Sequence, residues 1–389
     1  MNTVKAEAIE PGGVKDIKAM LASTGPCLSA YMALKNGTAN QAAKTNALAW
    51  REALRSVEQR ALQYGGEARE LVESVSDWES IMNSGEPQGR SIAVFRSPDV
   101  FRVTWVDEEI KQRAILGPHF FIRPLLPDLT KSRSFYILAL SKKNMRLLRC
   151  TTRTSEEVAF PPGTPASFDA YMNSAKPDHV SDNRGTPGPS SGSSKGIMFT
   201  TSSDREDKDE YLSHYFRQID RAVNEVLRGK TEPVVPAGVE KEIALYRIMN
   251  TGAHLAQEAV QGAPNSLKSG EMHARAIEAL DRCYEKKVDA ALAEYNHKAG
   301  GGASNRLREI LPAAHEGRVL TLLVSDSLET LGAFDENTYT VKGRETGTAE
   351  DEDLVNDAAV QCILHAGNVL VVPNGKMPNG VSVAGIFRF

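Results

Sequence analysis

A polar stretch in the middle of the chain, residues 161–208, limits most strongly what the sequence can fold into. Its residues are mostly Pro, Gly, Ser, Thr, Asn and Asp, and residues 181–196 read SDNRGTPGPSSGSSKG. These residue types favour turns and offer little apolar surface for a core. A loop of this length inside a compact domain is usually either functional or disordered. We therefore expect a long loop at residues 161–207, with regular structure on both sides of it.

Strand and helix patterns flank this loop. Before it, Phe135–Leu140 and Met145–Cys150 are apolar strands whose connection, residues 141–144, has the composition of a hairpin turn. After it, the patterns predict a helix, a strand and a second helix, at Glu210–Leu227, Pro233–Ala237 and Glu240–Met249. A strand, a helix and a further strand in this order imply at least one parallel crossover.

The segments at either end of the chain have patterns of their own. The first predicts helices at Val14–Ser23, up to Tyr64 and over Leu71–Met82, and strands at Leu28–Leu34, Ile92–Phe95 and Val100–Val106. The last predicts helices at Gly270–His297, Ser304–Ala314 and from Leu354 to before Gly367, and strands at Val319–Val324, Val369–Val372 and Val381–Phe387.

The length and these patterns predict an α/β protein of three domains. A chain of 389 residues is too long for one ordinary core. Prolines in Phe120–Leu129 can neither donate to a sheet nor continue a helix, so this segment is read as the first boundary. We expect an α/β domain at residues 1–130, a second domain at 131–250 and a third α/β domain at 251–389.

Composition and charge exclude several classes of protein. With 41% hydrophobic and 25% charged residues, the chain has the composition of a folded domain. The formal charge of −4 means that any contact with RNA must be local. The four cysteines lie far apart without zinc-ligand spacing, which predicts reduced thiols of a cytoplasmic protein. Because no run of 18 apolar residues occurs, a membrane span is not expected.

Basic residues gather at the start of the middle segment: Lys131, Arg133, Lys142, Lys143, Arg146 and Arg149. They can form a local patch for phosphates, or they can guard strand edges against pairing with other chains. Four of them, with four residues of the polar loop, are the candidate RNA-binding set: Lys142, Lys143, Arg146, Arg149, Arg184, Gly185, Lys195 and Gly196.

Motifs for cofactor or metal chemistry are not found. The histidines are scattered without metal-ligand spacing, there is no GxSxG, and the triglycine at residues 300–302 follows a helix without the spacing of a phosphate loop. We therefore predict neither a metal nor a cofactor, and no catalytic residue is identified. Two acidic sets leave hydrolase or nuclease chemistry open, although the second can simply cap a helix: Asp169, Asp178, Asp182 and Asp204, and Asp204, Glu206, Asp207 and Asp209.

Three stretches of the sequence resemble the bacterial archaeo-eukaryotic release factor family, in its third subgroup. They read FFIRPLLPDLTKSRSFYILALSKKNMRLLRCT at 120–151, YFRQIDRAVNEVL followed by EPVVPAGVEKEIALYRIMN within 215–250, and AAVQCILHAGNVLVVPNGKMPNGVSVAGIFRF at 358–389. The resemblance implies three domains similar to those of class-one release factors and of Pelota. It also implies an RNase H-like middle domain and a C-terminal domain similar to the L7Ae-type RNA-binding fold.

The chain departs from these factors where their chemistry lies. In release factors a Gly-Gly-Gln tip on a middle-domain loop enters the peptidyl-transferase centre, where it helps to place water and to stabilise charge. Here no glutamine occurs between Gln112 and Gln218, and residues 199–203 stand where relatives carry a His- and Gly-rich stretch. The Asn-Ile-Lys-Ser signature of stop-codon decoding is also missing from the first domain.

The prediction is therefore a ribosome-associated factor in termination, rescue or modulation of translation that contacts ribosomal RNA without Gly-Gly-Gln-dependent hydrolysis. A partner protein is expected at the C-terminal domain, and the sequence does not decide the oligomeric state. Two alternatives stay open, a metal-dependent hydrolase or nuclease on an RNase H-like fold and a non-catalytic interaction scaffold.

Overall fold

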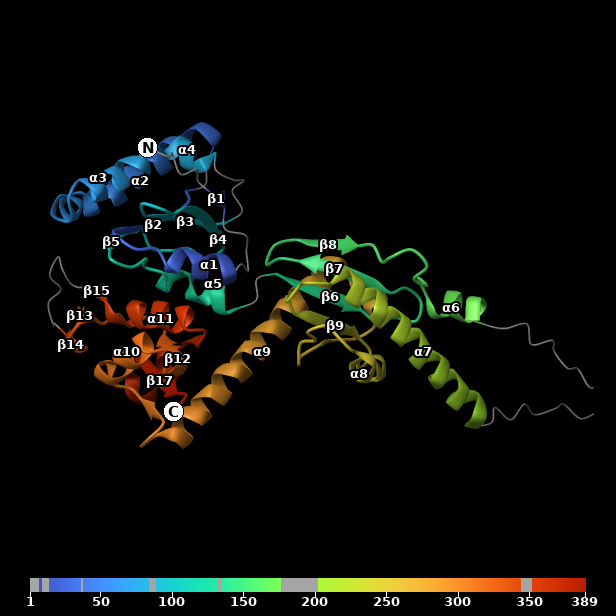
Figure 1. Ribbon diagram of the computed structural model, residues 1–389. Coiled ribbons are helices and arrows are strands. Elements are labelled where there is room, and N and C mark those ends of the chain that lie inside the picture. The colour runs from blue at the N-terminus through green and yellow to red at the C-terminus, as the bar shows by residue number, and fades with distance from the viewer. Residues whose placement is uncertain are drawn as a thin grey trace, which may run out of the picture. The chain divides into compact units, whose positions relative to one another are not determined.

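The chain forms two compact units in the computed structural model. The structure describes residues 7–8, 14–35, 38–83, 89–131, 134–175, 202–343 and 352–389. Unit 1 combines Met1–Arg133 with Tyr284–Phe389, and unit 2 is Ser134–Cys283 (Figure 1). The second division falls inside one long helix, α9 (Ser269–Lys298). Within the described part, no helix is long and apolar enough to cross a membrane.

The first part of unit 1 is a five-stranded sheet under a layer of helices. The strand order is β1-β4-β3-β2-β5, formed by Glu7–Ala8, Phe101–Val106, Ser91–Arg96, Cys27–Ala33 and Arg113–Gly117. One face is covered by α2 (Ala39–Tyr64), α3 (Gly66–Ser74) and α4 (Trp78–Met82) (Figure 1). Trp50 and Trp78 lie in contact there, and the Trp50 indole donates to the Val75 carbonyl at 2.7 Å. The sequence patterns did not predict the short strand β5.

The helix predicted over Leu71–Met82 is wrong as one element, because it breaks between α3 and α4. α3 ends at Ser74, and Asp77 begins α4 by accepting a hydrogen bond from the Glu79 backbone N–H at 3.2 Å. Ser and Asp side chains compete with the backbone for such bonds, which favours a helix start over helix continuation. The apolar stripe is nevertheless kept across the break, since Leu71, Trp78 and Ile81 are all buried.

The proline segment of residues 120–130 packs between the first and last parts of unit 1. Pro124 lies in a 3₁₀ turn at Arg123–Leu125, and Pro127 lies in the first turn of α5 (Leu126–Thr130), where a missing N–H costs nothing. This segment and α1 (Val14–Leu21) share one core cluster with residues beyond 300, such as Ile310 and Val355. The core of unit 1 is therefore formed jointly by its two chain segments.

The last part of unit 1 contains a four-stranded sheet of order β11-β17-β12-β16. These strands are Ala303–Ser304, Val383–Phe387, Val319–Ser325 and Asn368–Val372. β12 and β16 run parallel, with Leu322 opposite Val369, and the connection between them contains α11 (Leu354–Leu364). α10 (Leu307–His315) and α11 cover one face of the sheet, and the end of α9 covers the other. A small sheet of order β14-β13-β15, not predicted, comprises Thr340–Gly343, Leu331–Asp335 and Glu352–Asp353.

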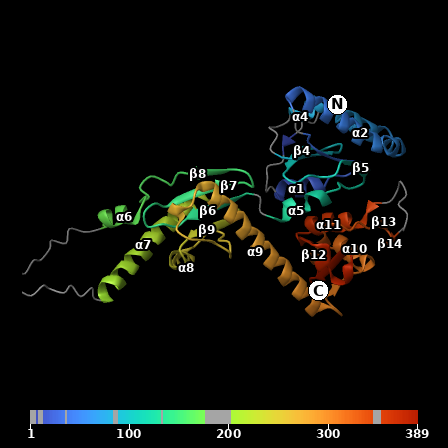
Figure 2. The same cartoon turned by 180° about the vertical axis from the view of Figure 1, so that it is seen from behind.

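Unit 2 is a single mixed sheet with helices on both faces (Figure 2). Its order is β10-β9-β6-β7-β8, formed by Val260–Gln261, Val234–Gly238, Phe135–Ala139, Arg146–Cys150 and Ser155–Val158. α7 (Ser202–Val226) and α8 (Glu240–Met249) pack on one face, and the start of α9 packs on the other. The predicted hairpin is confirmed by the antiparallel pairing of β6 and β7, and the predicted crossover by the parallel pairing of β6 and β9.

The α/β class is thus confirmed in both units. The division into three domains stays a prediction, as do the RNase H-like and L7Ae-type assignments. The residues from 251 to Cys283 belong to the compact unit that begins at Ser134. They supply β10 and the first half of α9, whose Met272, Ala276 and Ala279 complete the core on that face of the sheet.

Candidate functional site

The turn between β6 and β7 presents two of the candidate lysines on a fixed backbone. Lys142 and Lys143 are exposed. The Ser141 hydroxyl accepts from the Lys143 N–H at 3.2 Å and from the Asn265 amide at 2.8 Å. On the other side, the Phe168 N–H donates to the Lys142 carbonyl at 2.8 Å. The turn is therefore held from two directions while the ammonium groups remain available to solvent.

An acidic neighbour moderates the charge of this turn. Glu242, in the first turn of α8, is close enough for the two charges to interact: burial raises the pKa of Glu242, and the Lys142 charge opposes that rise. A phosphate group that approached the turn would compete with Glu242 for Lys142. Lys143 contributes a second charge next to it, so the turn can offer two adjacent cations to an anionic ligand.

The two arginines of the candidate set on β7 do not form one surface with this turn. Arg146 and Arg149 lie three residues apart on β7, so they point to opposite faces of the sheet. Arg146 is partly buried, and its guanidinium donates to the Pro264 carbonyl at 3.5 Å. Arg149 is exposed and stands opposite Tyr136 on one side and Glu156 on the other. Arg146 therefore tethers β7 to the loop after β10.

The remaining basic residues are distributed differently. Lys131 belongs to unit 1, where its ammonium lies 5.7 Å from the centre of the Tyr284 ring. Arg133 and the candidate loop residues lie outside the described residues: Arg184, Gly185, Lys195 and Gly196. Contact of the candidate set with RNA therefore stays a prediction, and the described part of it is centred on the β6–β7 turn.

An aromatic cluster supports the described ends of the predicted loop. The early apolar residues of that stretch form α6 (Phe168–Ala175), which packs on α7. The ring centroids of Phe168 and Tyr171 lie 5.8 and 5.7 Å from that of Tyr215. Tyr215 is fully buried, and burial raises the pKa of its hydroxyl. α6 ends at Ala175 and α7 begins at Ser202, so the predicted loop at residues 161–207 is wrong at both ends, where apolar contacts with Tyr215 stabilise α6 and α7 starts before the predicted Glu210 (Figure 1).

A buried carboxylate, missed by the sequence reasoning, joins α7 to the chain after α8. Asp220 is 2% exposed and accepts from the Tyr246 hydroxyl at 3.2 Å and the Asn224 amide at 3.1 Å. Thr251 donates to it with both its N–H, at 3.2 Å, and its hydroxyl, at 2.5 Å. These donors satisfy the buried charge, so Asp220 holds α7 in position. Its place among the apolar positions of the Glu210–Leu227 pattern was the available signal.

Most of the acidic residues that the sequence offered for metal chemistry lie outside the described residues or have side chains that do. Asp169 is an exposed residue of α6. Asp178 and Asp182, and the side chains of four residues in the first turns of α7, lie outside the described residues: Asp204, Glu206, Asp207 and Asp209. Among the side chains that the structure does describe, no three His, Cys, Asp or Glu gather into a set that could hold a metal ion.

Comparison with known families confirms the resemblance over the middle of the chain. Residues 134–318 match the family model of bacterial archaeo-eukaryotic release factor family 3. The match begins at the first residue of unit 2 and extends to the residue before β12. No protein of curated function matches the chain.

Several solved structures are similar to the chain along nearly its whole length. The archaeal translation termination factor aRF1 is 14% identical with a TM-score of 0.23, over 98% of this chain and 99% of that one. Archaeal Pelota, from a model of ribosome-bound Pelota and ABCE1, is 12% identical with a TM-score of 0.38, over 99% and 95%. Dom34 of S. cerevisiae, a translation termination-like factor, is 10% identical with a TM-score of 0.37, over 98% and 94%.

Proposed function

We propose that this chain binds the ribosome in the cytoplasm and acts in termination, rescue or modulation of translation, because residues 134–318 match the model of bacterial archaeo-eukaryotic release factor family 3. A translation-related, release-factor-like role follows from the family itself. The ribosomal binding, and an RNase H-like fold for unit 2, are the finer parts of the proposal. The match of residues 134–318 to this family model is the observation that carries it.

The proposal excludes one mechanism on sequence grounds. Gly-Gly-Gln does not occur in the chain, and the stretch from 113 to 217 contains no glutamine at all. The residues between α6 and α7 therefore cannot supply the side chain that helps release factors to hydrolyse the peptidyl ester. We expect that a peptidyl-tRNA hydrolysis assay on isolated ribosomes shows no release above background.

The β6–β7 turn is the described surface best suited to a phosphate backbone. Its two exposed lysines lie on a turn whose backbone is held by Ser141, Asn265 and Phe168. The backbone of such a turn loses little conformational freedom when its two lysines bind. Contacts of lysine with phosphates release counterions, so two contacts should make binding weaken about tenfold between roughly 50 and 200 mM salt.

Reversing both turn charges is expected to weaken ribosome binding at least about tenfold at low salt, because two attractive phosphate contacts become repulsive. The variant Lys142→Glu/Lys143→Glu would be compared with the parent by co-sedimentation with ribosomes over a salt series. The matched control is Arg221→Glu/Arg228→Glu, the same change of charge on two exposed residues of unit 2. Residue 228 precedes β9, whose Val234 pairs with Tyr136 at the end of β6 away from the turn.

Two outcomes would count against these ideas separately. If the turn variant and the control sediment alike, the turn does not contact the ribosome, although the chain can still bind it elsewhere. If the parent protein stays wholly in the soluble fraction at low salt, ribosome association itself is wrong. The interaction-scaffold alternative would then be favoured.

A further inference from the structure

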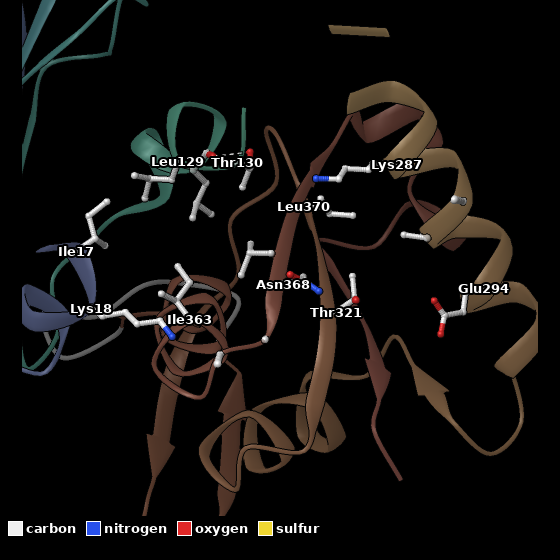
Figure 3. Close-up of a pocket in the computed structure, with 16 residues that line it drawn as sticks. Ile17, Lys18, Leu129, Thr130, Lys287, Glu294, Thr321, Ile363, Asn368 and Leu370 are labelled. Atoms are coloured by element: carbon white, nitrogen blue, oxygen red, sulfur yellow. Dashed lines mark hydrogen bonds between the residues drawn. The ribbon is translucent and has the colours of Figure 1, made fainter. Parts of the chain in front are cut away.

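A pocket of about 570 Å³ lies in unit 1 beside β16, the edge strand of the four-stranded sheet. Its walls come from α1 and α5 on one side and from α9 on the other, with β12, β16 and the end of α11 between them (Figure 3). Leu129, Ile363 and Leu370 make much of its surface apolar. Its volume lies within the range of about 300–1,000 Å³ that is usual for ligand sites.

On the outer edge of β16, the peptide groups of Val371 are hydrogen-bonded, whereas those of Val369 have no partner in the described part of the chain. The Tyr284 hydroxyl accepts from the Val371 N–H at 2.8 Å and donates to the Val371 carbonyl at 3.1 Å. These two groups therefore point away from β12, out of the sheet. The peptide groups of alternate residues in a strand point the same way, so the N–H and C=O of Val369 face outward too.

Val369 is only 8% exposed, yet its outward peptide groups lie against the pocket and have no hydrogen-bond partner among the described residues. Buried backbone groups are nearly always paired. The pocket thus contains one donor and one acceptor of the kind that an added strand would use. The Thr130 hydroxyl lies 3.2 Å from that of Tyr284, so it lies beside the part of the edge where Val371 is already hydrogen-bonded.

The charged residues of the lining indicate which side chains an added strand should have. Lys18 of α1 and Lys287 of α9 line the pocket from opposite sides, with Leu370 and Asn368 between them (Figure 3). Neither ammonium forms an ion pair with any residue that the structure describes. Glu294 is the single acidic residue in the lining. The pocket therefore favours negative charge at its rim and apolar side chains at its floor.

We propose that this pocket binds an extended acidic peptide segment of a partner protein, which adds to the edge of β16. Its backbone bonds to the N–H and C=O of Val369, its apolar side chains pack on Leu129 and Leu370, and its carboxylates face Lys18 and Lys287. Main-chain bonds supply affinity in this mode of recognition, and alternate side chains supply specificity. The proposal does not depend on the proposed contact of the β6–β7 turn with the ribosome, because every group that it uses belongs to unit 1 and that turn belongs to unit 2.

The test is fluorescence polarisation of the full-length chain with a panel of labelled pentapeptides that alternate valine, isoleucine or leucine with aspartate or glutamate. Acidic members of the panel are expected to bind, and the same sequences with lysine at the acidic positions are not. The variant Lys18→Glu/Lys287→Glu should weaken binding at least about tenfold by repulsion. Lys35→Glu/Lys44→Glu, with the same change on two exposed lysines of unit 1, should leave it unchanged.

A second arm uses the unaltered protein, so it does not depend on how a variant folds. Methylation of the central amide nitrogen of a binding peptide should weaken it at least about tenfold, because the peptide then cannot donate to the Val369 carbonyl. Equal binding of methylated and unmethylated peptides would overturn the added strand. Failure of the whole acidic panel to bind at millimolar concentration, or displacement of a bound peptide by single-stranded RNA, would overturn the peptide as ligand.

Ribosome co-sedimentation of Lys18→Glu/Lys287→Glu separates this proposal from the proposed function. We expect the variant to sediment as the parent does. A variant that lost both peptide and ribosome binding would show that the two lysines serve the ribosome, which contradicts a separate peptide site.

Discussion

Replacement of Arg123 by alanine is expected to lower the free energy of unfolding of unit 1 by about 3–5 kcal/mol. The Arg123 guanidinium lies 2.7 Å from a carboxylate oxygen of Asp353 and donates to the Ser325 carbonyl at 3.0 Å. The two charged side chains are only 7% and 3% exposed. Without Arg123, the Asp353 charge would stay buried with only the backbone N–H groups of Thr330 and Val355 as donors.

Urea denaturation followed by tryptophan fluorescence measures this loss in the right unit, because Trp50, Trp78 and Trp105 all lie in the first segment of the chain. Arg113→Ala is the matched control. Arg113 also forms an ion pair, 2.6 Å from Glu329, but these side chains are 35% and 38% exposed. An exposed pair contributes at most about 1 kcal/mol. Equal losses in the two variants would contradict the role given to burial.

This ion pair also explains why the organisation of unit 1 could not be predicted from local patterns. The segment around Phe120 contains two prolines and was read as a boundary. Its polar partners lie more than 200 residues further along the chain. The Asn356 side chain accepts from the Ile122 N–H at 2.7 Å and donates to the Phe120 carbonyl at 3.0 Å. Helices and the β6–β7 hairpin were predictable because their signals repeat over a few residues, whereas such contacts leave no periodic signal.

In the candidate site, too, local features could be predicted from the sequence and long-range contacts could not. The position of Lys142 and Lys143 on a turn followed from turn chemistry, and the separation of Arg146 from Arg149 follows from the two-residue period of a strand. The Asp220 network did not follow, because its donors on Tyr246 and Thr251 arrive from another helix and the turn after it. The open edge of β16 likewise depends on Tyr284, which reaches Val371 from a distant helix.

Glu352→Gln is expected to make unit 1 more stable than the parent at pH 8, by about 3 kcal/mol. Glu352 lies beside Gly117, where a methyl group on that glycine would come within 3.1 Å of its carboxylate. Burial, and then the Asp357 charge, raise the pKa of Glu352 from 4.5 to about 7, against the opposing charge of Arg60. Asp357 is itself buried and lies 3.2 Å from the His315 ring.

The direction with pH follows from this raised pKa. A carboxyl group that binds its proton more tightly in the folded state contributes most below its unfolded pKa, near 4.5, and loses that contribution as the pH rises through about 7. Glutamine cannot ionise. The parent should therefore lose stability between about pH 4.5 and 7 relative to Glu352→Gln, and the difference should be constant at higher pH.

Glu329→Gln is the control of opposite sign for this titration. The hydrogen bond from Arg113 lowers the pKa of Glu329, so its contribution is present above its unfolded pKa and lost in acid. Near neutral pH the glutamine variant at 329 should be less stable than the parent, whereas the one at 352 should be more stable. If Glu352→Gln were no more stable than the parent at pH 8, the attraction of Arg60 would have to offset fully the cost of holding the ionised Glu352 carboxylate in its partly buried position. Denaturation of Arg60→Gln at pH 8 would then decide between these accounts, because a compensating Arg60 should be strongly destabilising to remove.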